Sequence, residues 1–134
     1  MQTYLKNMKT AIGSMKNNAL ALLFTDFKEI TKARLAISVV FSSIAGYFLG
    51  AYEIQWFQVF LLAFGGYCMV GASNAYNQVI EKDLDALMKR TKNRPIPAGR
   101  MTVNFAMTIA VVLTLLGILS LYLLNRFLFF ISVL

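Results

Sequence analysis

Three apolar stretches without a charged residue dominate the sequence, at residues 35–51, 56–76 and 103–124. As a helix the last stretch would extend about 33 Å, which is enough to cross the hydrocarbon core of a bilayer. Within lipid, a single segment satisfies all its backbone N–H and C=O groups only as a helix. The sequence therefore predicts an all-α fold, a polytopic bundle of transmembrane helices.

Two shorter segments flank these spans. Residues 20–32 mix apolar and charged positions, which predicts an interfacial helix leading into the first span. Residues 127–134 are apolar but too short to cross a membrane, so we expect them to begin a fourth helix. Residues 77–102 are expected to form a loop that carries the functional side chains.

Composition excludes several classes of protein. With 58% hydrophobic and 14% charged residues, the chain is neither a disordered tail nor an ordinary soluble domain. It has no histidine and one cysteine, so these residues hold no His-ligated zinc or haem and no Ser–His or Cys–His pair. A metal bound here would be a hard cation on oxygen ligands.

The basic residues alternate between the two sides of the spans. Six Lys and Arg precede the first span, none separate the first from the second, six separate the second from the third, and one follows. This bias predicts a cytoplasmic N-terminus and a cytoplasmic loop 77–102, rather than binding to nucleic acid. We expect no cleaved signal peptide and a multi-pass protein of a bacterial inner membrane, although a mitochondrial transit peptide stays open.

The segment after the second span carries the chemistry. At about 100° per residue, Asn77, Glu81 and Asp85 fall on one helical stripe, with Asn74 on the same side and Asp83 pointing away. Carboxylates four residues apart on a helix repel each other, which predicts a cation between them. Mg²⁺ suits such oxygen ligands and shares its coordination shell with substrate phosphates.

Basic side chains follow this acidic stripe, at Lys89, Arg90, Lys92 and Arg94. Guanidinium groups next to a metal are what a diphosphate requires. Pro95, Pro97 and Gly99 predict a shaped loop, and Thr102 is expected to bond the first turn of the third span. The alternative is a solvated loop whose charges only set the membrane topology.

The pattern Asn77-x-x-x-Glu81-x-x-x-Asp85 resembles the first aspartate-rich motif of the UbiA superfamily of intramembrane prenyltransferases, with Glu in the middle place. Residues 90–95 are similar to the Arg-Thr-x-x-Arg-Pro that follows in that family. Residues 77–100 and 26–38 resemble the branch that farnesylates haem b. That branch usually has Lys-Pro-Arg at the position where this chain has Lys-Ala-Arg, at residues 32–34.

The resemblance implies a bundle of about nine helices, of which residues 1–134 would be the N-terminal three to four, in one domain. It implies Mg²⁺ on Asn77, Glu81 and Asp85, with Asn74 and Asp83 supporting these ligands. The resemblance further assigns the diphosphate of farnesyl diphosphate to Lys89, Arg90 and Arg94. The acceptor would be haem b, and a second acidic motif would lie outside these residues, which alone would be inactive.

Two other functions stay open. Another UbiA enzyme, acting on a quinone precursor or a lipid, would have the same metal site and a different acceptor pocket. A non-catalytic membrane scaffold or channel subunit would use the loop only as a topology signal. The second alternative predicts that Asp85→Asn leaves function intact.

Overall fold

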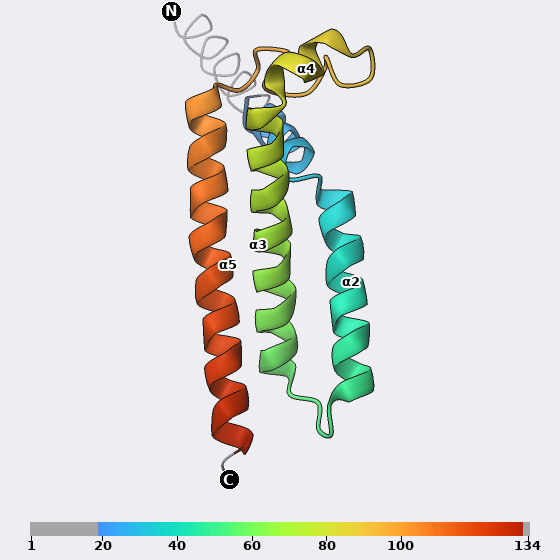
Figure 1. The fold of residues 1–134 in the computed structure, drawn as a ribbon, viewed down its shortest axis with the longest axis vertical. Coiled ribbons are helices and arrows are strands. Elements are labelled where there is room, and N and C mark those ends of the chain that lie inside the picture. The colour runs from blue at the N-terminus through green and yellow to red at the C-terminus, as the bar shows by residue number, and fades with distance from the viewer. Residues whose placement is uncertain (1–18, 133–134) are drawn as a thin grey trace, which may run out of the picture.

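The computed structural model describes residues 19–132. It contains a helix at residues 19–30, α2 (Ala33–Gly50), α3 (Trp56–Ile80), α4 (Lys82–Leu87) and α5 (Val103–Ser132), and no strand in this part of the chain. In Figure 1, α3 lies between α2 and α5, and α4 and the loop after it gather at one end of the row. The all-α prediction is confirmed.

Three of these helices are long and apolar enough to cross a membrane, at Ala33–Gly50, Trp56–Ile80 and Val103–Arg126. α3 continues past the expected end of the second span, so Asn77 still lies within it. The predicted separation of residues 127–134 from the third span is wrong, because α5 runs on to Ser132. Arg126 brings one charge but no helix-breaking Gly or Pro, and one charge does not end a helix.

Small residues bring α3 and α5 together. A Cβ built on Gly117 would lie 2.7 Å from Cγ of Met69, and one built on Gly65 would lie 3.1 Å from Leu121. Ser120 adds a buried hydrogen bond from its hydroxyl to the Leu61 carbonyl, at 2.9 Å. This agrees with the small faces that membrane helices use for close packing.

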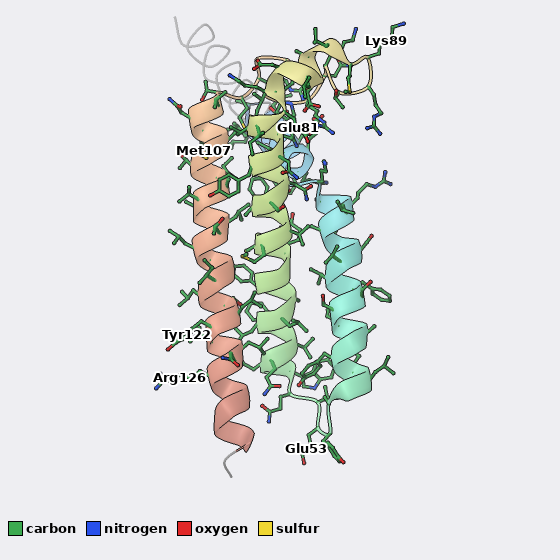
Figure 2. The ribbon with its side chains drawn as sticks, in the orientation of Figure 1. Glu53, Glu81, Lys89, Met107, Tyr122 and Arg126 are labelled. Atoms are coloured by element: carbon green, nitrogen blue, oxygen red, sulfur yellow. The ribbon has the colours of Figure 1, made fainter. Side chains whose placement is uncertain are left out.

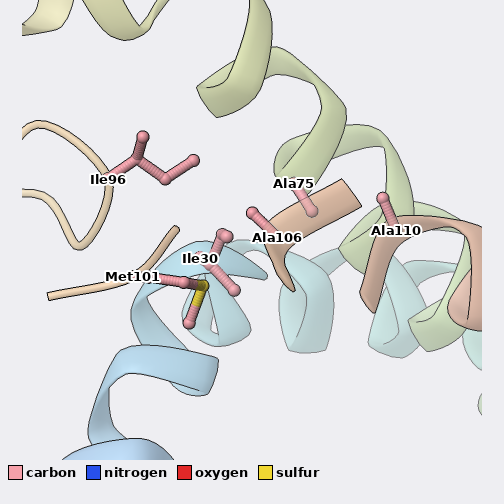
Figure 3. Packing of buried hydrophobic residues seen from close by; sticks show 6 residues of the cluster. All are labelled: Ile30, Ala75, Ile96, Met101, Ala106 and Ala110. Carbon is pink, nitrogen blue, oxygen red and sulfur yellow. The ribbon is translucent and has the colours of Figure 1, made fainter. Parts of the chain in front are cut away.

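The end of the bundle next to α4 has a compact apolar core, shown in Figure 3. Its members come from four parts of the chain: Ile30, Ala75, Ile96, Met101, Ala106 and Ala110. We call residues 19–32 and 81–102 the cap, and residues 88–101 within it the basic loop. Because Ile96 and Met101 are core residues, the basic loop is a packed part of the fold.

The helix at residues 19–30 meets α2 at a sharp bend. Lys32 has a φ of 46°, the left-handed conformation that usually ends a helix at glycine or asparagine. The bend is therefore made by the backbone of Lys32, and this chain forms it with an alanine, Ala33, as the next residue.

Candidate active site

The acidic stripe lies where α3 passes into α4. Helical geometry is interrupted for one residue at Glu81, which has φ −88° and ψ 5°. The hydrogen bonds nevertheless continue across it, from Glu81 N–H to Asn77 O and from Asp85 N–H to Glu81 O, both at 2.8 Å. Asn77, Glu81 and Asp85 thus occupy consecutive turns, as their spacing predicts, and Figure 2 shows Glu81 near the end of α3.

Asp85 differs from its two partners in environment. Asn77 and Glu81 are exposed, whereas Asp85 is only 4% exposed. Its Oδ2 accepts a hydrogen bond from Nη1 of Arg94 at 2.5 Å, in an ion pair that is largely shielded from solvent. Its backbone carbonyl accepts a bond from the Thr91 hydroxyl at 3.0 Å. The basic loop therefore folds back onto the acidic stripe at Asp85.

The structure divides the basic residues of the loop into two groups. Arg94 and Arg100 face acids, whereas Lys89, Arg90 and Lys92 are exposed and form no ion pair with any described residue. In Figure 2, Lys89 extends outward from the loop after α4, away from Glu81. Of the three residues expected at the diphosphate, only Arg94 is brought next to a predicted metal ligand.

Asn74 and Asp83 lie in opposite environments. Asn74 is buried, and its Nδ2 donates to the Val70 carbonyl at 2.9 Å and to the Thr31 carbonyl at 3.3 Å. Asp83 is exposed. Asn74 thus bonds the end of the helix at residues 19–30, and the expectation that both side chains support the metal ligands stays a prediction.

Sequence reasoning missed a second group of polar contacts in the cap. Arg100 Nε donates to Oδ1 of Asp26 at 2.9 Å, and its Nη2 donates to Oε2 of Glu29 at 2.8 Å. Gln78 Nε2 donates to the carbonyls of Glu29 and Ile30, at 3.2 and 3.0 Å. Gln78 Oε1 is buried and has no partner among the described residues. Nothing in the sequence signalled these contacts, because Asp26 and Glu29 lie in a segment that mixes apolar and charged positions.

The donor set agrees with a hard divalent cation. Asn77, Glu81 and Asp85 supply an amide oxygen and two carboxylates on successive turns, and oxygen ligands of this kind suit Mg²⁺. Within residues 19–132, no three His, Cys, Asp or Glu side chains gather closely enough to hold a metal ion by themselves. These residues therefore fit part of a metal site, and the remaining ligands would come from elsewhere.

Comparison with known proteins decides the family. The model of the UbiA prenyltransferase family matches residues 39–134, a range that includes the whole acidic stripe and the basic loop. The chain belongs to the UbiA prenyltransferase family. It is 67% identical over 109 residues to protoheme IX farnesyltransferase of Christiangramia forsetii, in a match that covers 81% of this chain and 36% of that protein.

Other relatives of this UbiA chain carry the same name. Protoheme IX farnesyltransferase of Flavobacterium psychrophilum is 67% identical over 106 residues, covering 77% of the chain and 35% of that protein. The Cytophaga hutchinsonii protein of this name is 37% identical over 106 residues, covering 77% and 37%. The chain thus spans about a third of the length of these relatives. No solved structure matches it. Its spans and its family make it an integral membrane protein.

Proposed function

We propose that this chain supplies the first acidic motif of a protoheme IX farnesyltransferase. The enzyme would transfer the farnesyl group of farnesyl diphosphate to a vinyl group of haem b, which gives haem O. The observation that carries this proposal is the family match across residues 39–134, together with the 67% identity to a relative of that name.

Asn77, Glu81 and Asp85 would hold Mg²⁺ together with ligands outside this chain. When bound, the ion would neutralise charge on the diphosphate oxygens. Arg94 is held beside Asp85 by their ion pair, so its guanidinium lies next to the place where phosphate oxygens would gather. Lys89 and Arg90 are exposed on the same loop and are free to contact the outer phosphate.

The cationic side chains act on the leaving group. The bond between the farnesyl carbon and the diphosphate oxygen breaks with both electrons going to the oxygen, and Arg94 and Arg90 stabilise that developing charge. The allylic carbon then bonds to the terminal vinyl carbon of haem b. Water adds to the resulting cation and loses one proton, which leaves a hydroxyethylfarnesyl group. An apolar cavity in the whole enzyme would exclude the bulk water that otherwise quenches the first cation.

The distribution of Lys and Arg supports a cap on the cytoplasmic side of a bacterial inner membrane. On that side the charged head of farnesyl diphosphate stays in water while its tail enters the lipid. Both substrates would then reach the site from the inner leaflet.

A chimera tests the activity and the acceptor. This chain replaces the matching third of the Christiangramia forsetii relative, and purified protein is incubated with farnesyl diphosphate and either haem b or 4-hydroxybenzoate. We expect a farnesylated haem product that requires Mg²⁺ and disappears with a chelator. A product on 4-hydroxybenzoate alone would assign the chain to another branch of the family.

Substitutions in the chimera test the acidic stripe. We expect Asp85→Asn and Glu81→Gln each to lower kcat/KM by about a hundredfold or more, because each removes a charge that binds the metal. Asp83→Asn should lower it much less, because Asp83 is exposed and its position in the helix points away from the stripe. Equal losses at all three acids would contradict the assignment, and full activity in Asp85→Asn would favour a scaffold. The 134-residue chain alone should show no turnover.

A further inference from the structure

The helix at residues 19–30 depends on α3 to complete its hydrogen bonds. The last carbonyls of a helix have no partner within the helix. Here Gln78 bonds those of Glu29 and Ile30, and Asn74 bonds that of Thr31. Asn74 and Gln78 are one turn apart on α3, in the same two turns as Asn77. The backbone that presents the acidic stripe is therefore fastened to this helix.

Arg100 fastens the other side of the same helix. The carboxyl group of Asp26 is 7% exposed, and a buried carboxylate is strongly destabilising without a charged partner. Arg100 is this charged partner, because its Nε donates to Asp26. Its Nη2 donates to Glu29, which lies one helical turn after Asp26. Two acids are thus held by two different nitrogens of one planar group. The single nitrogen of a lysine cannot reproduce this arrangement.

The basic loop is consequently anchored at both ends. At its entrance Arg94 and Thr91 bond Asp85, and at its exit Arg100 bonds Asp26. Pro95 and Ile96 are buried between these two points. Lys89 and Arg90, by contrast, are exposed and lie just before the first anchor.

We infer that Arg100 is a positioning residue, which locks the exit of the basic loop to Asp26 and Glu29. Together with the anchor of Thr91 and Arg94 at Asp85, this lock fixes where Arg90 and Lys89 stand relative to the acidic stripe. Arg100 itself does not contact the diphosphate. The part of this inference that concerns diphosphate rests on the proposed function, whereas the lock between loop and helix does not.

If Arg100 bound the substrate directly, substitution of its acidic partner would not have the same effect as substitution of Arg100 itself. If Arg100 were a diphosphate ligand, Asp26→Asn would release it, and affinity would rise or stay the same. If it is a lock, Asp26→Asn and Arg100→Gln damage the same contact. The two effects are then similar and do not add, as expected for two residues that act through one contact.

Limited digestion with trypsin tests the lock without any reaction. The full chain is placed in lipid vesicles, and the rate of cleavage between Arg90 and Thr91 is followed by mass spectrometry. We expect Arg100→Gln and Asp26→Asn each to raise this rate about tenfold, and the double variant no further. Arg100→Lys should lie in between. Lys92→Gln, which removes an exposed charge from the same loop, is the matched control and should stay within about twofold.

Glu29→Gln keeps the experiment decisive if a stronger variant does not fold, because it removes only the exposed half of the lock. We expect it to raise cleavage about threefold. Unchanged cleavage in both Arg100→Gln and Glu29→Gln would overturn the lock.

Kinetics of the chimera test the positioning role. Arg100→Gln should raise KM for farnesyl diphosphate about tenfold and change kcat less than about threefold, with partial recovery in Arg100→Lys. Asp26→Asn should do the same. A raised KM in Arg100→Gln with an unchanged KM in Asp26→Asn would make Arg100 a direct ligand and overturn the inference. If the chimera is inactive throughout while the digestion result holds, the proposed function fails and the lock stands.

Discussion

In the cap, Arg100 forms ion pairs with Glu29 and Asp26, which lie 71 and 74 positions earlier in the sequence. Between α3 and α5, the contact relies on close approach at Gly65 and Gly117, with one hydrogen bond from Ser120. The cap is thus held by directional bonds between particular polar atoms. In the spanning half, α3 and α5 are held mainly by close packing, and α2 and α3 share a hydrogen bond from the Tyr47 hydroxyl to Gln58 Oε1 at 2.7 Å.

The difference follows from the two solvents. In the cap, polar groups that leave water must find partners, and an unpaired buried charge is strongly destabilising. In the membrane, lipid is as apolar as the side chains, so burial of a leucine between helices gains little and close packing of small residues decides the contact. Side chains such as Phe41 and Leu49, 73% and 90% exposed in the described part, are suited to lipid or to further helices.

The largest loss of stability should come from leaving a buried charge in the cap without its partner. Arg94→Gln leaves Asp85 without its cation, and we expect the free energy of unfolding in detergent to fall by about 3 kcal/mol. Arg90→Gln, an exposed change in the same loop, should cost less than about 0.5 kcal/mol. Similar losses in the two variants would show that the cap does not depend on this pair.

In the spanning half, overpacking should have the next largest effect. The side chain of Gly117→Val would collide with Met69 and the Gly65 carbonyl, and we expect a loss of about 2 kcal/mol by thermal unfolding in detergent. Gly46→Val is the matched control, because a Cβ there has nothing within 4 Å. If Gly46→Val were as damaging, close packing of α3 against α5 would not explain the loss, and helix propensity would not either, because valine is a better helix former than glycine.

The hydrogen bond between α3 and α5 should be weak. Ser120→Ala removes the bond to Leu61, and we expect a loss of about 0.6 kcal/mol, as is typical of such bonds in membranes. Chemical unfolding in mixed micelles would measure it. A loss as large as that in Arg94→Gln would erase the distinction between the two regions.

The smallest effect should be a gain, at the bend where the two regions meet. Lys32→Gly relieves the left-handed conformation, and we expect about 0.5 kcal/mol of added stability in the same unfolding assay. Arg34→Gly, inside α2, should instead lose about 1 kcal/mol. A loss at Lys32 would mean that its side chain makes a contact worth more than the relieved strain.

Periodicity predicted the helices and the stacking of Asn77, Glu81 and Asp85, because both depend on local geometry. The residue type of Thr102, just before the third span, predicted its bond to the first turn of α5, which the structure confirms at 3.3 Å to the N–H of Phe105. Periodicity also placed Asn74 on the side of the metal ligands. Asn77 comes three positions after Asn74, a difference of about 60° around the helix, and that is enough to bury Asn74 and expose Asn77.

The sequence could not predict which distant residues pair with each other. The basic loop offers several cations of similar chemistry, and nothing in their spacing tells which one meets Asp85 or Asp26. Which cation meets which acid depends on the path of the loop, and that path depends on the burial of Pro95 and Ile96. The continuation of α5 past Arg126 was missed for a simpler reason, since one charge resembles a loop in a hydropathy pattern.

Cys68 is the one cysteine in the sequence, and it is 2% exposed, packed with Ala72 and Leu113 in the middle of the spanning half. Within these 134 residues, a thiol reagent that does not enter lipid will find no exposed native target. A cysteine introduced at Tyr52, in the turn between α2 and α3, or at Lys89 would then be the only exposed thiol of residues 1–134, in intact cells or in inverted vesicles. This part of the protein is therefore ready for mapping which loop faces which compartment, without first replacing a cysteine of its own.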